Sequence, residues 1–271
     1  MIPRWSARTC AATFLAVSGL VGCSADRAEP PPPASPSAPA AATLGYRVVR
    51  TLPHDPQAFT QGLVIADGAL FESTGARGSG SSIRRIDLAT GKVVAKATLP
   101  RRVFAEGLAV HDDRLYQVTW QDHVLMTYDW QLNRISEQPF RHEAWGLTSN
   151  ATRLILSDGT DTLTLLDPRT LAKSKTVKVS DHGTPITRLN ELERDGGDVW
   201  ANILGSPNIA RIDLASGQVR AWLDLSALVK TAAGSDGDAV LNGIAVEPET
   251  GHLYVTGKLW PTIFVLELSG P

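Results

Sequence analysis

The chain has 271 residues, of which 43% are hydrophobic, and a formal net charge of −2 at pH 7. Its lysines and arginines are scattered and form no basic stripe, which argues against nucleic-acid binding. Its two cysteines are Cys10 and Cys23, so residues 45–271 contain no cysteine and can form neither a disulfide, a cysteine-ligated metal site nor a thiol nucleophile.

The first residues predict an export signal. Arg4 and Arg8 precede an apolar run at 11–21 that is too short to span a membrane as a stable helix. The run ends in Leu-Val-Gly-Cys23, which resembles the signal of a bacterial lipoprotein, whose cysteine becomes the acylated first residue of the mature protein. An ordinary cleaved signal with an incidental cysteine is the alternative. We predict a lipoprotein-type signal peptide at 1–22 and lipid attachment at Cys23.

A tether follows the signal. Residues 28–43 are almost all Pro, Ala, Ser and Glu, a composition that cannot build a core. We therefore predict a tether at 23–44 and one folded domain at 45–271, a length that suits a closed all-β domain. The signal and the tether together predict an exported protein, held by its lipid in the bacterial cell envelope, at the periplasmic face or the outer membrane.

Five segments of the folded part share one frame: a variable residue, then Gly (Glu in one copy), then Leu or Ile. The frame forms the end of each of the segments 59–63, 104–108, 143–147, 188–192 and 240–244. The variable residue is, in turn, Gln61, Glu106, Trp145, Asn190 and Asn242. Repetition of this kind is typical of circular or stacked folds. Variation at one equivalent position indicates that five copies of a scaffold contribute to one site.

The spacing of the frames predicts the fold. The copies begin 39 to 52 residues apart, and each frame is followed by a β-rich run and by an apolar strand that ends in an acidic residue. Units of this size with about four short strands are propeller blades. The last copy lacks a fourth strand, which the run at 46–52 can supply, so that the ring closes without exposed edges. We predict an all-β, five-bladed β-propeller closed by an N-terminal strand; a solenoid, the alternative, needs capping repeats that the sequence lacks.

The variable frame residues predict where a site lies. The first strand of each propeller blade lines the central channel, so these residues face one mouth, and Glu106 is the one ionisable residue among them. Phe59 and Phe104 stand two residues before Gln61 and Glu106, and strand alternation turns them to the same face. The ends of the second strands bring three more side chains near this mouth: Trp120, Asp158 and Lys258. An aromatic cup with a few polar groups is the usual form of a small-ligand site, although such residues can also simply plug a channel.

Five longer motifs stand at ordered positions along the folded part: Pro-His-Asp-Pro-Gln-Ala-Phe-Thr-Gln-Gly-Leu (53–63), Phe-Ala-Glu-Gly-Leu (104–108), Trp-Gly-Leu-Thr (145–148), Leu-Asn-Glu-Leu-Glu (189–193) and Thr-Gly-Lys-Leu-Trp-Pro (256–261). Together they resemble the plant and bacterial type of glutaminyl-peptide cyclotransferase, also called glutamine cyclotransferase. The resemblance runs from about residue 46 to 268. It implies a five-bladed propeller that cyclises an N-terminal glutamine to pyroglutamate with loss of ammonia, and it implies no cofactor.

The resemblance also implies roles for particular residues. Glu106 matches the family's catalytic acid, and Asn190 and Lys258 match positions that bind and polarise the substrate. Lys258 could instead pair with Glu106 and set its pKa, and the sequence leaves both roles open. The residues that match the pocket walls are Phe59, Gln61, Phe104, Trp120 and Trp145.

The implied reaction suits these residues, because the substrate's own α-amine is the nucleophile and the enzyme then needs no Ser, Cys or activated water. The expected partners are peptides or proteins with N-terminal glutamine, bound by a monomer; no metal is expected, and a structural calcium ion stays open. The alternative is a non-catalytic envelope lipoprotein that binds a peptide or a protein. Glu106, Asn190 and Lys258 together favour the enzyme, because a binding module needs no proton shuttle. A calcium-dependent propeller lactonase is a third reading, which the scattered carboxylates do not favour.

Other residues in these motifs have structural interpretations. We expect His54 and Asp55, between two prolines, to fix a loop, and Glu191 and Glu193 to contact neighbouring blades. Asn242 is as consistent with structure as with function.

Overall fold

The computed structural model describes residues 41–75, 80–100 and 103–270. The predicted signal peptide at 1–22 and Cys23 lie outside these residues. The described part of the chain is built almost entirely of strands, with one helix, α1 (Ser226–Ala232). None of its helices is long and apolar enough to cross a membrane.

Three sheets have four strands each, paired antiparallel in chain order. The first holds β2 (Thr60–Ala66), β3 (Ala69–Thr74), β4 (Ser82–Asp87) and β5 (Val93–Thr98). The second holds β6 (Ala105–His111), β7 (Arg114–Thr119), β8 (Val124–Tyr128) and β9 (Arg134–Pro139). The third holds β10 (Leu147–Ser149), β11 (Leu154–Leu156), β12 (Thr162–Leu166) and β13 (Lys173–Lys178). A small hairpin follows, formed by β14 (Ser180–Asp181) and β15 (Thr184–Pro185).

A fourth sheet has eight strands and contains the N-terminal strand. Its order is β16 (Leu189–Asp195), β17 (Asp198–Ile203), β18 (Asn208–Asp213), β19 (Val219–Asp224), β1 (Ala42–Pro53), β22 (Thr262–Ser269), β21 (Leu253–Gly257) and β20 (Leu241–Val246). β1 lies antiparallel beside β22 along 45–53, as the predicted closing strand requires. Residues 42–44, the three residues that precede the predicted domain boundary, also pair with β19 in parallel. Through this second pairing β1 joins two four-stranded groups into one sheet. The predicted closure by an N-terminal strand is confirmed.

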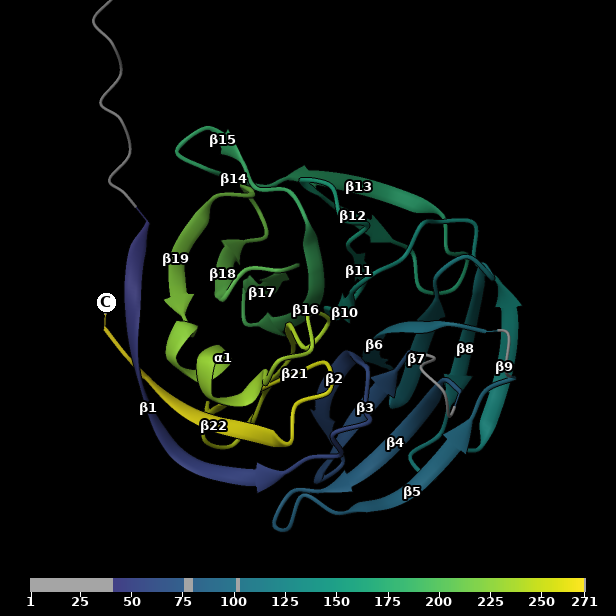
Figure 1. The fold of residues 1–271 in the computed structure, drawn as a ribbon. Helices are drawn as coiled ribbons and strands as arrows, with labels where there is room; N and C mark the ends of the chain where they lie inside the picture. The colour runs from purple at the N-terminus through teal and green to yellow at the C-terminus, as the bar shows by residue number, and fades with distance from the viewer. Residues whose placement is uncertain (1–40, 76–79, 101–102, 271) are drawn as a thin grey trace, which may run out of the picture. The chain divides into compact units, whose positions relative to one another are not determined.

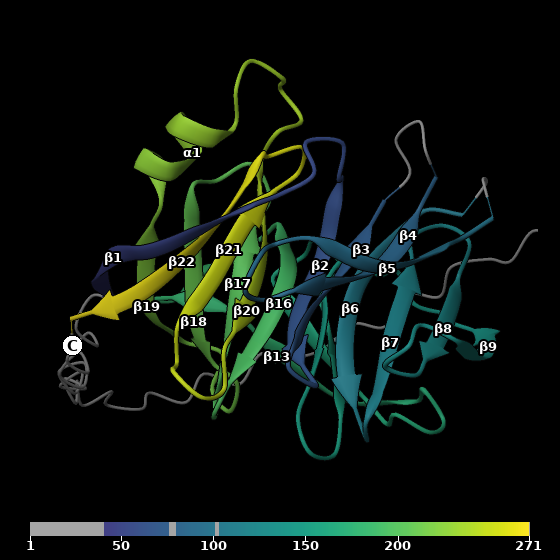
Figure 2. The same cartoon turned by 90° about the horizontal axis from the view of Figure 1, so that it is seen from below.

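The innermost strands form a ring. β2, β6, β10, β16 and β20 contact one another in this order, and β20 returns to β2 (Figure 1). Figure 2 shows α1 at one end of this ring and β6 running away from that end. The chain is all-β with propeller-like sheets, while the number of separate blades stays a prediction, because β1 merges the last two groups.

The repeated frame has a physical cause at the ring's centre. A Cβ on Gly107 would lie 2.3 Å from the backbone nitrogen of Leu147, and one on Gly146 would lie 2.0 Å from the carbonyl oxygen of Asn190. Real Cβ atoms do not approach backbone so closely, so only glycine lets neighbouring inner strands come together here. The frame glycine is therefore required by packing, and the residue before it is free to vary.

In the fourth copy a glutamate takes the place of this glycine. The two carboxylate oxygens of Glu191 accept hydrogen bonds from the backbone N–H groups of Leu63 (3.2 Å) and Ile244 (2.9 Å), which belong to β2 and β20. Glu193 accepts one from Val246 at 3.1 Å. Glu191 thus contacts the first sheet through Leu63, and both glutamates contact β20 at the other end of their own eight-stranded sheet. Burial raises the pKa of Glu191 well above its ordinary range.

Candidate active site

A cavity of about 230 Å³ gathers most of the predicted site residues at the ring's mouth. It is lined by Gln61, Phe104, Glu106, Trp120, Trp145, Asn190, Leu204 and Lys258. All but Leu204 were predicted from the sequence. The inner strands place Gln61, Glu106 and Asn190 as the second residues of β2, β6 and β16, while Trp120 and Lys258 follow the ends of β7 and β21. The structure therefore brings together side chains that lie far apart in the chain.

Aromatic rings in edge-to-face contact form one side of the site. Phe59 lies behind the lining residues, with its ring centroid 4.8 Å from Lys258 Nζ and 6.2 Å from that of Phe104. The ring of Phe104 in turn lies 6.0 Å from that of Trp120. A cation over an aromatic face is stabilised by the ring's quadrupole. The ring of Phe59 thus contacts Lys258 from one side, and Phe104 and Trp120 continue the aromatic wall.

Glu106 and Lys258 are the two oppositely charged groups of the cavity. Glu106 is 6% exposed, and burial raises its pKa well above the ordinary value, with the charge of Lys258 opposing and that of Glu143 adding to the shift. Lys258 is 7% exposed, and burial lowers its pKa against the charge of Glu106. Among the described residues, neither terminal group hydrogen-bonds another side chain. Both remain available to a substrate.

Amide side chains form the opposite part of the site. Asn242 is fully buried, and its Nδ2 donates to the carbonyl oxygen of Thr60 (2.9 Å) and to Oε1 of Gln61 (3.3 Å). This contact leaves the amide N–H groups of Gln61 for the cavity. The carbonyl oxygen of Asn190 accepts from Oγ of Ser157 at 2.6 Å, which fixes the backbone of that strand. Asn242 therefore supports Gln61 and does not line the cavity itself.

Two residues of the site were missed by the sequence analysis. Oε1 of Glu143 accepts the indole N–H of Trp120 at 2.7 Å and that of Trp145 at 3.2 Å. Glu143 stands two residues before Trp145, so the alternation that selected Phe59 and Phe104 also selects it. Leu204 follows β17 as Trp120 follows β7, and the same rule of strand ends selects it as well.

A buried polar network fixes the segment that carries Lys258. His54 is bonded through Nδ1 to the carbonyl oxygen of Trp260 (2.6 Å) and through Nε2 to Oε1 of Glu72 (2.9 Å). Both partners only accept, so both ring nitrogens carry protons and the imidazole is cationic. Asp55 accepts from Nη1 of Arg84 at 2.9 Å. The predicted loop-fixing role of His54 and Asp55 is confirmed.

These interactions move two pKa values in opposite directions. Burial alone would lower the pKa of His54, but the charge and hydrogen bond of Glu72 outweigh it, and the pKa is raised. Burial alone would raise the pKa of Glu72, but the charges of His54 and Arg84 outweigh it, and the pKa is lowered. Each shift favours the charged form of its group. The Trp260 carbonyl that His54 contacts lies two residues after Lys258 in the chain.

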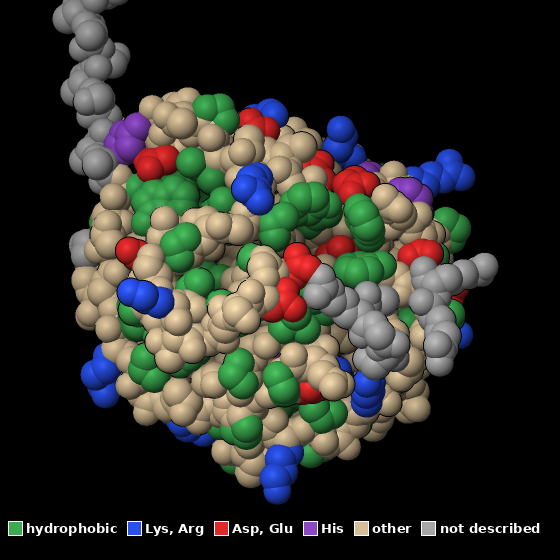
Figure 3. All heavy atoms as spheres, viewed as in Figure 1, with side chains coloured by type: hydrophobic (Ala, Val, Ile, Leu, Met, Phe, Trp, Pro, Cys, Tyr) green, Lys and Arg blue, Asp and Glu red, His purple; other side chains and the backbone are tan. Residues whose placement is uncertain are grey.

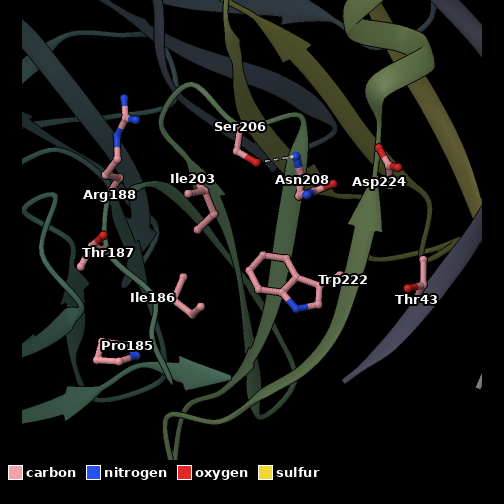
Figure 4. Close-up of a pocket in the computed structure, with 10 residues that line it drawn as sticks. All are labelled: Thr43, Pro185, Ile186, Thr187, Arg188, Ile203, Ser206, Asn208, Trp222 and Asp224. Carbon is pink, nitrogen blue, oxygen red and sulfur yellow. Dashed lines mark hydrogen bonds between the residues drawn. The ribbon is translucent and has the colours of Figure 1, made fainter. Parts of the chain in front are cut away.

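A larger cavity, of about 550 Å³, contains none of the predicted site residues. Figure 4 shows Trp222 facing Ile186 and Ile203, with Arg188 and Asp224 at opposite sides. The two cavities share a wall. Ile203 lines the larger one and the next residue, Leu204, lines the smaller one. The backbone N–H of Leu204 also donates to the carbonyl oxygen of Arg188, which lines the larger cavity, at 2.9 Å. The acid and base of the larger cavity, Asp224 and Arg188, are both exposed, unlike Glu106 and Lys258.

Figure 3 shows acidic and hydrophobic side chains gathered near the centre of the face that is seen in Figure 1. In residues 41–75, 80–100 and 103–270, no group of three or more His, Cys, Asp or Glu side chains is arranged to hold a metal ion.

Comparison with known proteins places this site in a family. The model of the glutamine cyclotransferase family matches residues 16–268. A glutaminyl-peptide cyclotransferase from Arabidopsis thaliana is 42% identical over 229 residues, which cover 82% of this chain and 71% of that protein. The crystal structure of Myxococcus xanthus glutaminyl cyclase matches with a TM-score of 0.79 and 39% identity, over 84% of this chain and 98% of that one. The chain belongs to the glutamine cyclotransferase family.

Proposed function

We propose that the protein is a glutaminyl-peptide cyclotransferase, which converts the N-terminal glutamine of peptides or proteins to pyroglutamate and releases ammonia. The observation that carries the proposal is the meeting of Glu106, with its raised pKa, and Lys258, with its lowered pKa, in one aromatic cavity. Membership in the family and the likeness to the Arabidopsis and Myxococcus proteins support it.

The reaction balances within the substrate itself. The α-amine nitrogen attacks the side-chain carboxamide carbon, a new C–N bond forms, and the bond to the carboxamide nitrogen breaks. One proton must pass from the attacking amine to the departing ammonia, and no outside reactant is consumed. The protein therefore has to bind, move a proton and stabilise the oxygen that becomes negative.

Glu106 is the residue suited to move the proton. A free α-amine has a pKa near ~8, and an apolar, poorly hydrated site favours the neutral form that can attack. Burial raises the pKa of Glu106 and so makes its carboxylate a stronger base, which can accept a proton from the amine and then give it to the leaving nitrogen. Help of this kind is worth about 10²- to 10⁴-fold in rate.

Lys258, Asn190 and Gln61 are the donors available for the carboxamide oxygen. Preorganised donors in a water-poor cavity stabilise the developing oxyanion without further reorganisation. In this proposal Phe104, Trp120 and Trp145 enclose the glutamine side chain, while Phe59 contacts Phe104 and Lys258.

The test is to incubate the purified protein with a peptide that begins with glutamine and to follow ammonia release over several pH values. The same peptide with an acetylated N-terminus is the matched control, because its blocked nitrogen cannot attack. Release from the free peptide alone, well above the rate in buffer, is expected. No acceleration at any pH would exclude the proposed activity.

We further propose that the enzyme is exported and anchored by a lipid on Cys23. The arginines, the apolar run and the small residues before Cys23 support this, as does the Pro-rich tether that follows. Cys23→Ser is expected to move the protein from the membrane fraction to a soluble one. A variant that stays in the membrane fraction would exclude the anchor.

A further inference from the structure

Glu143 connects two tryptophans that come from different sheets. It lies between β9 and β10, and its side chain is exposed. Trp120 follows β7 and Trp145 precedes β10, yet both indole N–H groups point to the same oxygen, Oε1 of Glu143, at 2.7 and 3.2 Å. One carboxylate therefore links two walls of the cavity.

The link acts on ring orientation more than on stability. Hydrogen bonds to a charged acceptor are shorter and stronger than those between neutral groups. Trp120 is 38% exposed, so its N–H could bond water if the carboxylate were lost. The fold would therefore lose little, while both rings would gain rotational freedom at the cavity.

Glu143 also acts on the cavity through its charge. Its negative charge raises the pKa of Glu106, in addition to burial, while the ammonium of Lys258 lowers it. A further carboxylate, Asp122, accepts the backbone N–H of Phe104 at 3.0 Å from the β7–β8 connection. Among these groups, Glu143 alone combines a charge acting on Glu106 with contacts to the cavity walls.

We propose that Glu143 is a positioning residue of the cyclotransferase: through one oxygen it orients Trp120 and Trp145 around the substrate glutamine, and through its negative charge it acts on the Glu106 carboxyl. This inference rests on the proposed function. It predicts two separable effects, since an amide can replace the acceptor oxygen but cannot replace the charge.

Two variants of the full chain separate these effects. Glu143→Gln keeps an acceptor for the indoles and removes the charge, so KM stays near the wild-type value while the pH–rate limb that reports Glu106 moves to lower pH. Glu143→Ala removes both the acceptor oxygen and the charge, so the pH–rate limb of Glu106 again moves to lower pH. In this variant KM also rises, by about tenfold for a lost charge-assisted hydrogen bond. Indole fluorescence is expected to change in the alanine variant alone.

Glu137→Gln is the matched control, because Glu137 is an exposed carboxylate on the outer strand β9, paired with Arg134 at 2.6 Å. It makes the same change in net charge and is expected to leave both KM and the pH profile unchanged. If the alanine variant fails to fold, the glutamine variant still tests the effect of the charge. If Glu143→Gln gives the pH profile of the active wild type, the inference is wrong while the proposed function stands. A wild-type protein that releases no ammonia overturns both.

Discussion

At the scale of single residues, burial brings the pKa values of Glu106 and Lys258 closer together. The carboxyl of Glu106 becomes a weaker acid and the ammonium of Lys258 a stronger one, while their mutual attraction opposes both changes. A low-dielectric site strengthens each of these effects relative to water. Glu106 is therefore a stronger base, and Lys258 a stronger acid, than the same side chains would be in water.

Replacing Glu106 by glutamine tests the proton transfer. Glu106→Gln keeps the shape of the side chain and removes its ability to accept a proton, so kcat should fall by about 10²- to 10⁴-fold. The melting temperature should not fall, because no hydrogen bond to a described side chain is lost. Full activity in this variant would show that another group carries the proton.

Replacing Lys258 separates the two roles that the sequence left open. Without the ammonium, the pKa of Glu106 should rise further, because Lys258 now lowers it, and the corresponding pH–rate limb should move to higher pH. Loss of a donor to the oxyanion should lower kcat by about 10²- to 10³-fold. Lys258→Met is expected to show both effects, whereas Lys258→Arg should leave the limb in place. A limb that stays unshifted in Lys258→Met would exclude the action on Glu106.

At the scale of elements, the segment after β21 is held to the first sheet by His54 and Glu72. The ion pair is fully enclosed, with side-chain exposures of 2% and 0%. Removing one member of a buried pair leaves the other uncompensated and is strongly destabilising. The segment that carries Lys258 is thus fixed by a contact that is itself sensitive to pH.

The contribution of the His54–Glu72 pair to the stability of the fold should be greatest in mildly acidic solution. The folded pKa of His54 lies above its ordinary 6.5, so its contribution is complete below pH 6.5 and is lost as pH rises through the raised value. The folded pKa of Glu72 lies below its ordinary 4.5, so its contribution is present above pH 4.5 and is lost as pH falls through the lowered value. Both contribute fully between these limits.

Melting curves over pH measure this maximum. Glu72→Gln removes the charge that raises the pKa of His54, and it should destabilise the protein by about 3 kcal/mol while flattening the pH dependence on both sides. Glu267→Gln, at an exposed pair with Arg47, is the control and should have little effect. An unchanged pH dependence in Glu72→Gln would contradict the assigned charges.

At the scale of the whole molecule, β1 closes the ring by pairing on both sides. Residues 42–44 add a short parallel ladder to β19, and Leu44 is 6% exposed within the core beside it. A protein that begins at residue 45 should therefore be less stable than one that begins at residue 41, by about 2 kcal/mol for the buried leucine alone. Thermal unfolding of the two proteins compares them, with Leu44→Ala in the longer one as control. Equal melting temperatures would show that the ladder contributes nothing.

The sequence predicted the repeated frame and the side chains whose strand position turns them toward the mouth of the ring. The frame glycines follow from the close approach of inner strands, and the residues beside them, Gln61, Glu106 and Asn190, follow from position alone. The pairing of residues 42–44 could not be predicted, because their composition is that of the tether and only β19 makes them a strand. The partners of His54 could not be predicted either, because Glu72 and Trp260 contact it only in the folded protein and no local sequence pattern indicates these contacts.

Glu191 links three inner strands across the centre of the ring. Its carboxylate spans the centre of the ring from β16 to the backbone of β2 and β20, and it is fully buried. A polypeptide therefore cannot thread through the ring, and what enters the mouth must stop there. Under the proposed function, this closure favours the end of a substrate chain over a continuous one.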